Sequence, residues 1–235
     1  MQGTIRHRLL VNALVDPDEA ARHLPDGLRP HIAEDATVVG CCLLSIDRVR
    51  PAGFPAKFGR PLVAVAHRIS ATWDDEAGET NVGVFVPVRP TTSAPARVIG
   101  GRWFPGVHRP ATIGHDVTSC NQSWSVEPRS SADRYSIRVR ATVAPGEATE
   151  PFEPTGETCL SAAVGVSPDG RGVLEAARME PDHHLANQVE IDKLDSHFLD
   201  AFTSIRPTTS YLMRDVQVRW TRASAPAVAA TGGAG

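Results

Sequence analysis

Residues that could bind and transform a small acidic molecule gather in one segment, RVIGGRWFPGVHRPATIGH, at positions 97–115. An arginine holds a carboxylate through two parallel hydrogen bonds, so Arg97 and Arg102 are candidate anchors for an anionic substrate. The neighbouring aromatic side chains of Trp103 and Phe104 could close such a pocket. The same composition also fits a glycine- and proline-containing turn with exposed arginines, and both interpretations remain open.

Two histidines of this segment, His108 and His115, are the candidate catalytic residues. An imidazole exchanges a proton near neutral pH, so either ring could serve as general acid or base. Asn121, Gln122 and Trp124 follow shortly afterwards and could donate hydrogen bonds to a carbonyl or enolate oxygen. Ordinary polarity at the edge of a strand is the simpler explanation for these three residues.

The segment 61–73, PLVAVAHRISATW, places a histidine and an arginine on opposite faces of an expected strand. His67 shares its face with valines and Trp73, which predicts a hydrogen-bonded core residue. Arg68 shares the other face with small residues, which leave room for its side chain in a lumen. A buried arginine needs an anionic partner or ligand, so Arg68 is a further candidate for substrate binding.

Other reactive groups are few. The only lysines are Lys57 and Lys193, and we expect both to be solvated. The four cysteines form no CxxC pair, and no GxSxG, GxGxxG or phosphate-binding loop is present. His183 and His184 are adjacent, so their side chains diverge in either a helix or a strand. We therefore predict neither a metal site nor a cofactor.

The elements that must position these residues are mainly strands. The segment RYSIRVRATV at 134–143 alternates apolar and polar residues, which predicts a strand with one solvent-exposed face. The expected strands are 4–15, 37–49, 61–73, the TNVGVFVPV segment after DDEAGE, 134–143, 157–166, 171–179 and 211–221.

Only two helices are expected. Asp16-Pro17-Asp18 supplies a cap and a first turn for a short helix that ends before Gly27. The segment 192–203 has apolar residues at helical spacing and Asp192 as a possible cap. The order of elements favours an α+β, mainly β fold in a single domain over residues 1–222, with a disordered tail at 223–235.

Composition limits the classes of partner. The chain of 235 residues has 41% hydrophobic residues and a formal net charge of -3, which offers no global attraction to nucleic acid or anionic membranes. No apolar stretch reaches the length of a membrane span or a signal peptide core. We expect a soluble, cytoplasmic protein with reduced thiols, whose partner is a small molecule and which could form a homo-oligomer.

Three stretches, taken in order, carry a resemblance to a known family. They are VNALVDPDEAARHLPDGLRPHI, then AHRISA with VGVFVPVRPTTSAPARVIGGRWFPGVHRPA, and finally SYLMRDVQVRW. Together they resemble the acetoacetate decarboxylase superfamily over most of residues 5–221. The resemblance implies curved antiparallel sheets in a β-barrel-like arrangement around a small cavity, and an activity on small carbonyl acids.

The same resemblance indicates that the best-known reaction of the family is lost. The classical decarboxylase forms a Schiff base through a lysine that follows a Tyr-Pro turn, and this sequence has Phe104-Pro105-Gly106 there. Glycine has no side-chain amine that could form a Schiff base, so Schiff-base decarboxylation is disfavoured.

These observations predict a lysine-independent, cofactor-independent enzyme that acts on a small carbonyl- or carboxylate-bearing metabolite in biosynthesis. Lyase, dehydratase, isomerase and cyclase reactions all suit arginine anchoring combined with histidine acid–base catalysis. The alternative is a non-catalytic small-molecule-binding protein that keeps the pocket of the superfamily, because one fold hosts both kinds of function.

Overall fold

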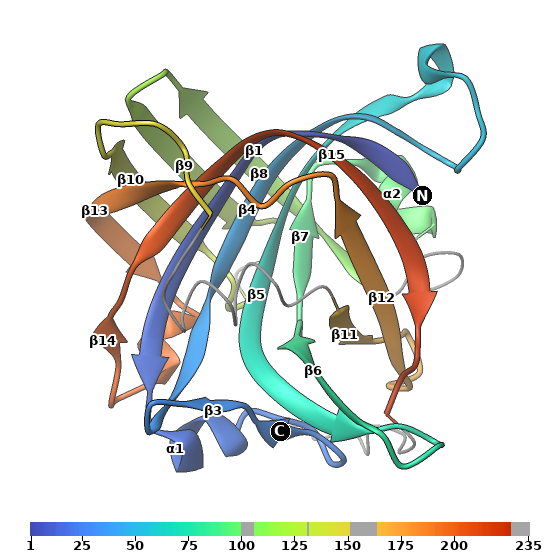
Figure 1. Cartoon of the computed structure of the whole chain (residues 1–235), viewed down its shortest axis with the longest axis vertical. Coiled ribbons are helices and arrows are strands. Elements are labelled where there is room, and N and C mark those ends of the chain that lie inside the picture. The colour runs from blue at the N-terminus through green and yellow to red at the C-terminus, as the bar shows by residue number, and fades with distance from the viewer. Residues whose placement is uncertain (100–105, 131, 151–163, 227–235) are drawn as a thin grey trace.

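The computed structural model describes residues 1–99, 106–130, 132–150 and 164–226 (Figure 1). The strands are β1 (Gln2–Val15), β2 (Arg29–Pro30), β3 (Ile32–Ala33), β4 (Ala36–Arg50), β5 (Arg60–Asp74), β6 (Thr80–Phe85), β7 (Arg89–Thr91), β8 (His108–Val117), β9 (Asn121–Pro128), β10 (Ile137–Val143), β11 (Val164–Pro168), β12 (Leu174–Pro181), β13 (Asn187–Ser196), β14 (Arg206–Pro207) and β15 (Ser210–Ala223). The helices are α1 (Pro17–Ala21) and α2 (Ala94–Ile99), with 3-10 turns η1 (Ala56–Phe58) and η2 (Leu199–Ala201).

The strand pairings close on themselves in two rings. One ring, which we call the pocket ring, runs through β1, β4, β5, β6, β11, β12 and β15. The other, which we call the packed ring, leaves β5 through β7, β8, β9, β10 and β13 and returns to β15. Nearly all pairings are antiparallel, but β6 with β11 and β7 with β8 are parallel. The strands β15, β1, β4 and β5 belong to both rings.

The shared strands send alternate side chains to the two sides. On β4, Cys41 and Leu43 join the core of the packed ring, whereas Cys42 and Leu44 turn toward the pocket ring. The core of the packed ring is filled by large side chains from many strands, including the fully buried Trp124 and Ile137. The alternation therefore separates a filled interior from one that contains a cavity.

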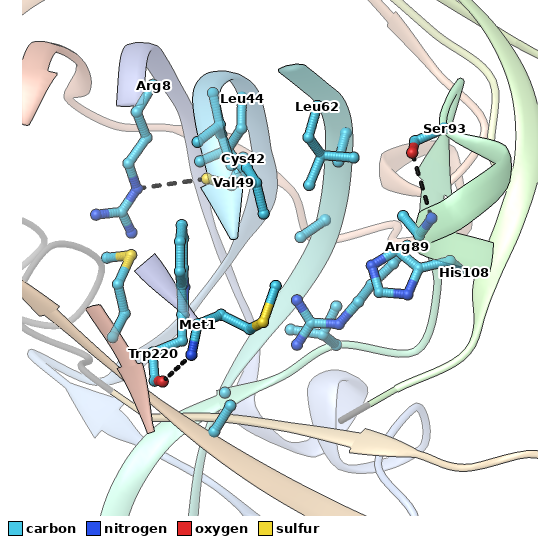
Figure 2. Close-up of a pocket in the computed structure, with 18 of the residues that line it drawn as sticks. Met1, Arg8, Cys42, Leu44, Val49, Leu62, Arg89, Ser93, His108 and Trp220 are labelled. Atoms are coloured by element: carbon cyan, nitrogen blue, oxygen red, sulfur yellow. Dashed lines mark hydrogen bonds between the residues drawn. The ribbon is translucent and has the colours of Figure 1, made fainter. Parts of the chain in front are cut away.

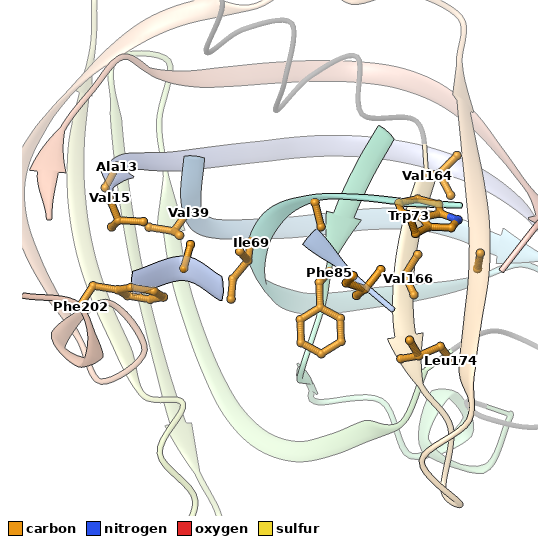
Figure 3. Packing of buried hydrophobic residues seen from close by; sticks show 14 of the residues in the cluster. Ala13, Val15, Val39, Ile69, Trp73, Phe85, Val164, Val166, Leu174 and Phe202 are labelled. Atoms are coloured by element: carbon orange, nitrogen blue, oxygen red, sulfur yellow. The ribbon is translucent and has the colours of Figure 1, made fainter. Parts of the chain in front are cut away.

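A second apolar cluster packs around α1, η2 and the far ends of β5 and β6 (Figure 3). Trp73 and Phe85 contribute rings beside Val164 and Val166 of β11. Asp16 caps α1 by accepting hydrogen bonds from the backbone N–H groups of Asp18 and Glu19.

Three neighbouring strands interrupt their alternation near one end of the pocket ring. The register between β1 and β4 shifts around Arg6, and Arg48 of β4 and Asp215 of β15 have φ angles of 55° and 54°. Such β-bulges insert one residue and reverse which face the following side chains take. As a result Ile5 and Leu10, an odd and an even position, lie in the same cluster. Arg6 joins the bulges through ion pairs to Asp47, at 2.8 Å, and to Asp215, at 2.7 Å.

Most expected elements are confirmed. The segments 4–15, 37–49, 61–73 and 211–221 are strands, and the first six residues of the TNVGVFVPV segment form β6. Within β10, Ile137, Val139 and Ala141 are buried while the intervening arginines are exposed, as the alternation predicted. Residues 157–163 lie outside the described residues, but β11 and β12 pair around the SPDGR turn as expected.

The predicted helix at 192–203 is wrong. Residues through Ser196 continue β13, and only Leu199–Ala201 form a 3-10 turn. Asp192 accepts a hydrogen bond from Thr142 at 3.0 Å instead of capping a helix. Pairing with β10 supplies backbone hydrogen bonds that a short isolated helix could not match.

The predicted tail begins too early. β15 continues to Ala223, and Ala225 packs against the cluster around α1. Residues 227–235, where the rest of the predicted disorder falls, lie outside the described residues.

Candidate functional site

A cavity of about 330 Å³ lies inside the pocket ring (Figure 2). Its described lining is Met1, Arg8, Cys42, Leu44, Ile46, Val49, Arg50, Pro51, Phe58, Arg60, Pro61, Leu62, Ala64, Ala66, Arg68, Val84, Val86, Arg89, Ser93, Ala96, His108, Gly165, Ala177, Met179 and Trp220. The set contains five arginines and a histidine but no aspartate or glutamate. The electrostatic potential of the cavity therefore favours an anion.

Strand register brings two of the basic residues to one level of the cavity. Thr91 of β7 pairs with Ala64 of β5, so Arg89, two residues earlier, lies level with Ala66. His108 of β8 is the register partner of Arg89. Figure 2 shows the side chains of Arg89 and His108 together on one side of the cavity, across from Arg8.

Arg68 enters the cavity from β5 at its inner end. Its side chain is only 4% exposed, and its Nη2 donates to Asn12 Oδ1 at 3.2 Å. The sequence predicted that small neighbours on the same face would leave it room, and Ala64 and Ala66 line the cavity beside it. The predicted position of Arg68 in a lumen is thus confirmed, while its role in binding stays a prediction.

Arg8 enters from β1 and is 5% exposed. Its Nε donates to Cys42 Sγ and its Nη1 to Met213 Sδ, both at 3.5 Å. Sulfur atoms are weak acceptors, so these contacts offset only part of the cost of burying a charge. Arg8 is therefore a strong candidate to contact a bound anion.

Gly106 stands where the family resemblance places the Schiff-base lysine, and the surrounding atoms exclude any side chain there. Its φ is +87°, and an added Cβ would lie 2.8 Å from Ser167 Cβ and 2.9 Å from Arg89 Nε. Arg89 occupies this space and donates from Nε and Nη2 to Ser167 Oγ at 3.2 and 2.9 Å. Glycine thus allows the guanidinium to approach the backbone.

His108 is the histidine that faces the cavity. Burial, followed by the positive charge of Arg89, lowers the pKa of His108 to about 4, against the effect of a hydrogen bond with the Gly106 backbone. The ring is consequently neutral at pH 7 and can accept a proton. Its Nδ1 is buried and has no hydrogen-bond partner among the residues that the structure describes.

Neither lysine reaches this cavity. Lys57 is exposed on η1, with its Nζ 5.2 Å from the centre of the Phe58 ring. Lys193 is exposed on β13, in a strand rather than in the predicted helix. Because the chain has no other lysine, the described cavity holds no amine side chain for a Schiff base.

Four of the residues predicted from sequence lie elsewhere. His115 is exposed on β8, where its ring stacks on Trp124 at 4.8 Å between centroids. Trp124 and Gln122 are buried in or beside the packed ring, with Trp124 Nε1 donating to Gln122 Oε1 at 3.4 Å. Asn121 is exposed and accepts from Thr142 Oγ1 at 3.4 Å. None of the four lines the described cavity, and their roles in catalysis or binding stay predictions.

The remaining predicted residues belong to the connection between β7 and β8. Arg97 lies on α2 but does not line the cavity, although Ser93 and Ala96 of the same segment do. Arg102, Trp103 and Phe104 lie outside the described residues. The segment 97–115 therefore contributes one described residue of predicted function, His108, to the cavity.

His67 is a core residue, as the sequence predicted. It is fully buried, its Nδ1 lies 3.1 Å from Cys41 Sγ, and its Nε2 lies 3.2 Å from the Tyr135 carbonyl oxygen. Burial lowers the pKa of His67 to about 4 and raises that of Cys41 to about 12. Both groups are neutral and point away from the cavity.

The described residues offer neither a metal site nor a membrane-spanning helix. No group of three or more His, Cys, Asp or Glu side chains within it is arranged to hold a metal ion. No helix in this part of the chain is long and apolar enough to cross a membrane.

Sequence reasoning missed Arg8 and Arg89, although a usable signal was present. Arg8 precedes the apolar run LLVNALV in an expected strand, and Arg89 follows VFVPV. The criterion that selected Arg68, an arginine within an apolar strand, applies equally to both. Their shared cavity depends on pairings between distant strands, which the sequence does not display.

This arrangement of strands is the acetoacetate decarboxylase-like fold, as expected from the sequence. An acetoacetate decarboxylase-like enzyme from Sphingomonas wittichii RW1 matches with a TM-score of 0.61 at 13% identity, over 95% of this chain and 91% of that one. The enduracididine biosynthesis enzyme MppR, complexed with the condensation product of pyruvate and imidazole 4-carboxaldehyde, matches with a TM-score of 0.59 at 12% identity, over 95% and 90%.

An acetoacetate decarboxylase from Legionella pneumophila matches with a TM-score of 0.56 at 14% identity, over 95% of this chain and 87% of that one. No family model and no curated protein sequence matches the chain. At these identities the likeness establishes the fold, while the chemistry has to be argued from the site.

Proposed function

We propose that this protein is a lysine-independent enzyme that acts on a small carbonyl- or carboxylate-bearing metabolite. The observation that carries the proposal is the convergence of Arg68, Arg89 and His108 on a cavity whose described lining has no acidic residue. The matching structures are those of enzymes, which supports catalysis as the general class of function.

In the proposed reaction, the arginines hold the substrate and His108 moves a proton. Arg68, oriented by Asn12, binds the carboxylate, and Arg89 lies beside the carbonyl oxygen. Neutral His108 takes a proton from the carbon next to the carbonyl, and the electron pair moves onto the carbonyl oxygen. The charge of Arg89 stabilises the resulting enolate. Return of the proton to another carbon isomerises the substrate, and loss of a leaving group completes an elimination.

An anionic substrate would also adjust the base. Burial is the larger cause of the low pKa of His108, and the charge of Arg89 is the second, so a bound anion near Arg89 would raise that pKa. A general base works best when its pKa lies near the operating pH, so substrate binding would improve His108 as a base.

The test measures proton abstraction directly. A series of 2-oxo acids is incubated with the protein in D2O, and exchange of the protons next to the carbonyl is followed by NMR. We expect exchange above the buffer rate, and His108→Gln should slow it by about 100-fold. His115→Gln, on the same strand but outside the cavity, is the matched control and should keep the wild-type rate.

Two results would contradict the proposal. Equal exchange by wild type and His108→Gln would remove the assigned base. A stable mass adduct after borohydride treatment with pyruvate or acetoacetate, mapped by peptide analysis to Lys57, Lys193 or the cavity-lining Met1 amine, would show Schiff-base chemistry, which the proposal excludes.

A non-catalytic binding protein is the second candidate. The walls between the basic groups are largely apolar, and Leu44, Ile46 and Leu62 form part of them. Such a cavity can retain a ligand without transforming it. Saturable binding of an oxo acid without any catalysed proton exchange would support this candidate over the enzyme.

A further inference from the structure

The cavity is arranged in levels, which strand register defines. Gly40, Cys42, Leu44 and Ile46 of β4 pair in turn with Arg68, Ala66, Ala64 and Leu62 of β5. Moving along β5 toward its start, the cavity therefore passes from an inner basic level to a largely apolar middle level. Arg8 of β1, the register partner of Leu44, adds one guanidinium at the inner border of the middle level. We use inner level for Arg68, Arg89 and His108, and middle level for Leu44, Ile46, Val49, Leu62, Met179 and Trp220.

The middle level faces the interior from both sides of the pocket ring. Met179 of β12 pairs with Trp220 of β15, opposite the wall that Leu44, Ile46 and Leu62 form. Beyond it, Arg60 and the 60%-exposed Phe58 mark the level nearest to solvent. Ala66, which is level with Arg89, and Arg60 are six positions apart on β5. The inner level and the level nearest to solvent are therefore separated by about 20 Å.

The size of the cavity exceeds the needs of the smallest oxo acids. A volume of about 330 Å³ equals the space of about eleven water molecules in the liquid. Pyruvate or acetoacetate would fill the inner level and leave the apolar walls of the middle level in contact with water. A ligand with an apolar body would cover those walls and gain their hydrophobic contribution.

We propose that the substrate is a 2-oxo or 3-oxo acid that carries an apolar body of medium length. Its carboxylate and carbonyl occupy the inner level, and its hydrocarbon chain or ring lies along the middle level toward Phe58. This inference rests on the proposed function, because it takes the inner level as the site of reaction. It differs in predicting how the substrate continues beyond the reacting groups.

The test measures affinity along a homologous series. Isothermal titration calorimetry is run with straight-chain 2-oxo acids from pyruvate to 2-oxooctanoate, and with phenylpyruvate. We expect the Kd to fall about fourfold for each added methylene until the middle level is filled. Affinity that is unchanged or weaker with increasing length would overturn the apolar body. A neutral ketone, 2-octanone, should bind at least about tenfold more weakly than 2-oxooctanoate, and equal binding would overturn the anionic head.

Two variants test where the hydrocarbon chain of the ligand lies. Leu62→Ala should weaken the binding of 2-oxooctanoate by about tenfold or more and leave the affinity for pyruvate unchanged. Leu194→Ala removes the same side chain from β13 outside the cavity and should change neither affinity. If Leu62→Ala does not fold, Ala64→Leu provides the opposite change, and it should shorten the chain length that binds best. Unchanged length dependence in the folded variant would overturn the assignment of the middle level.

The outcome separates this inference from the proposed function. Length-dependent binding without proton exchange would support the ligand class and contradict the enzyme. Proton exchange with affinities that do not rise with length would support the enzyme and contradict the ligand class.

Discussion

Leu43 and Leu44 are adjacent on β4 and chemically identical, yet they enter different environments. Leu43 is fully buried among the side chains of the packed ring, whereas Leu44 borders the cavity of the pocket ring. The same division recurs on β5, where Val65 and His67 face the packed side and Ala66 and Arg68 face the cavity. Adjacent positions on the shared strands thus serve stability on one face and binding on the other.

The difference lies in what each face leaves unfilled. Large apolar side chains fill the packed ring, and its buried histidine is satisfied by Cys41 and Tyr135. The pocket ring combines alanines with buried arginines, which neither close-pack nor neutralise one another. Removing side-chain atoms from the packed face should therefore leave a cavity and lower the stability of the fold. Changes on the cavity face should mainly alter which ligand binds and how tightly.

The matched pair on β4 gives the largest expected effect. Leu43→Ala should lower the free energy of unfolding by about 2–5 kcal/mol, because it leaves a cavity in a filled core. Leu44→Ala should cost clearly less, because its side chain already borders empty space. Denaturant unfolding of both variants tests the comparison, and equal losses would show that the two faces are packed alike.

The second-largest expected effect is a pH dependence of stability that arises from His67, the buried histidine of the packed ring. Burial lowers the pKa of His67 to about 4, whereas an unfolded histidine titrates near about 6.5. The unfolded chain therefore binds the proton more readily, so stability is full above about pH 6.5. It should fall by up to about 3 kcal/mol as the pH drops to about 4. Glu19 adds to the loss only at the lower end of this range. Hydrogen bonds from Ser204 and Thr203 lower its pKa to about 2, so its contribution to stability is lost as the pH falls below about 5.

Denaturation curves measured from pH 7 to pH 4 check this expectation. The low pKa of His108 also lowers the free energy of unfolding as the pH falls, so the contributions of the two histidines have to be separated. His67→Gln should flatten the slope in the absence of ligand, and a bound oxo acid should reduce the part due to His108. A slope that His67→Gln leaves unchanged would rule out the buried histidine as its source.

A buried arginine of the pocket face gives the smallest expected change, and one of opposite sign. Within the described part of the chain, the side-chain nitrogens of Arg8 donate only to the sulfur atoms of Cys42 and Met213, at 3.5 Å, so its charge is poorly compensated. Arg8→Met should raise the free energy of unfolding by about 1 kcal/mol and weaken binding of an oxo acid. Thermal unfolding measures the change in stability, and titration calorimetry on the same preparation measures the change in affinity. Lower stability would show that the guanidinium contributes more than its burial costs.

Local patterns in the sequence predicted the long strands of the pocket ring and β10, whereas β8, β9 and β13 were not among the expected strands. The alternation of β10 and the opposite facing of His67 and Arg68 follow from the period of a strand, which depends only on neighbouring residues. Asp16 likewise caps α1 through its own next two residues. The family resemblance supplied the fold, and the matching structures bear this out.

Features that depend on distant pairing were not predictable in the same way. The pairing of β12 with β15 and the parallel contact of β6 with β11 close the pocket ring, and neither leaves a local signal. For this reason Arg8 was missed, and His115 was placed in the site because of its closeness in sequence to His108. The spacing of Phe198 and Phe202 imitated a helix, although both rings pack in a loop beside η2.

The bulges at Arg6, Arg48 and Asp215 have a consequence for changes in chain length. Beyond them Val49, Val218 and Trp220 face inward only because each strand contains one additional residue. Exchange of a side chain at these positions preserves that count, and glycine at 215 would even relieve the positive φ. Deletion of one residue would turn the inward-facing side chains at the mouth of the cavity outward. The number of residues in these strands therefore determines the lining of the mouth, independently of their composition.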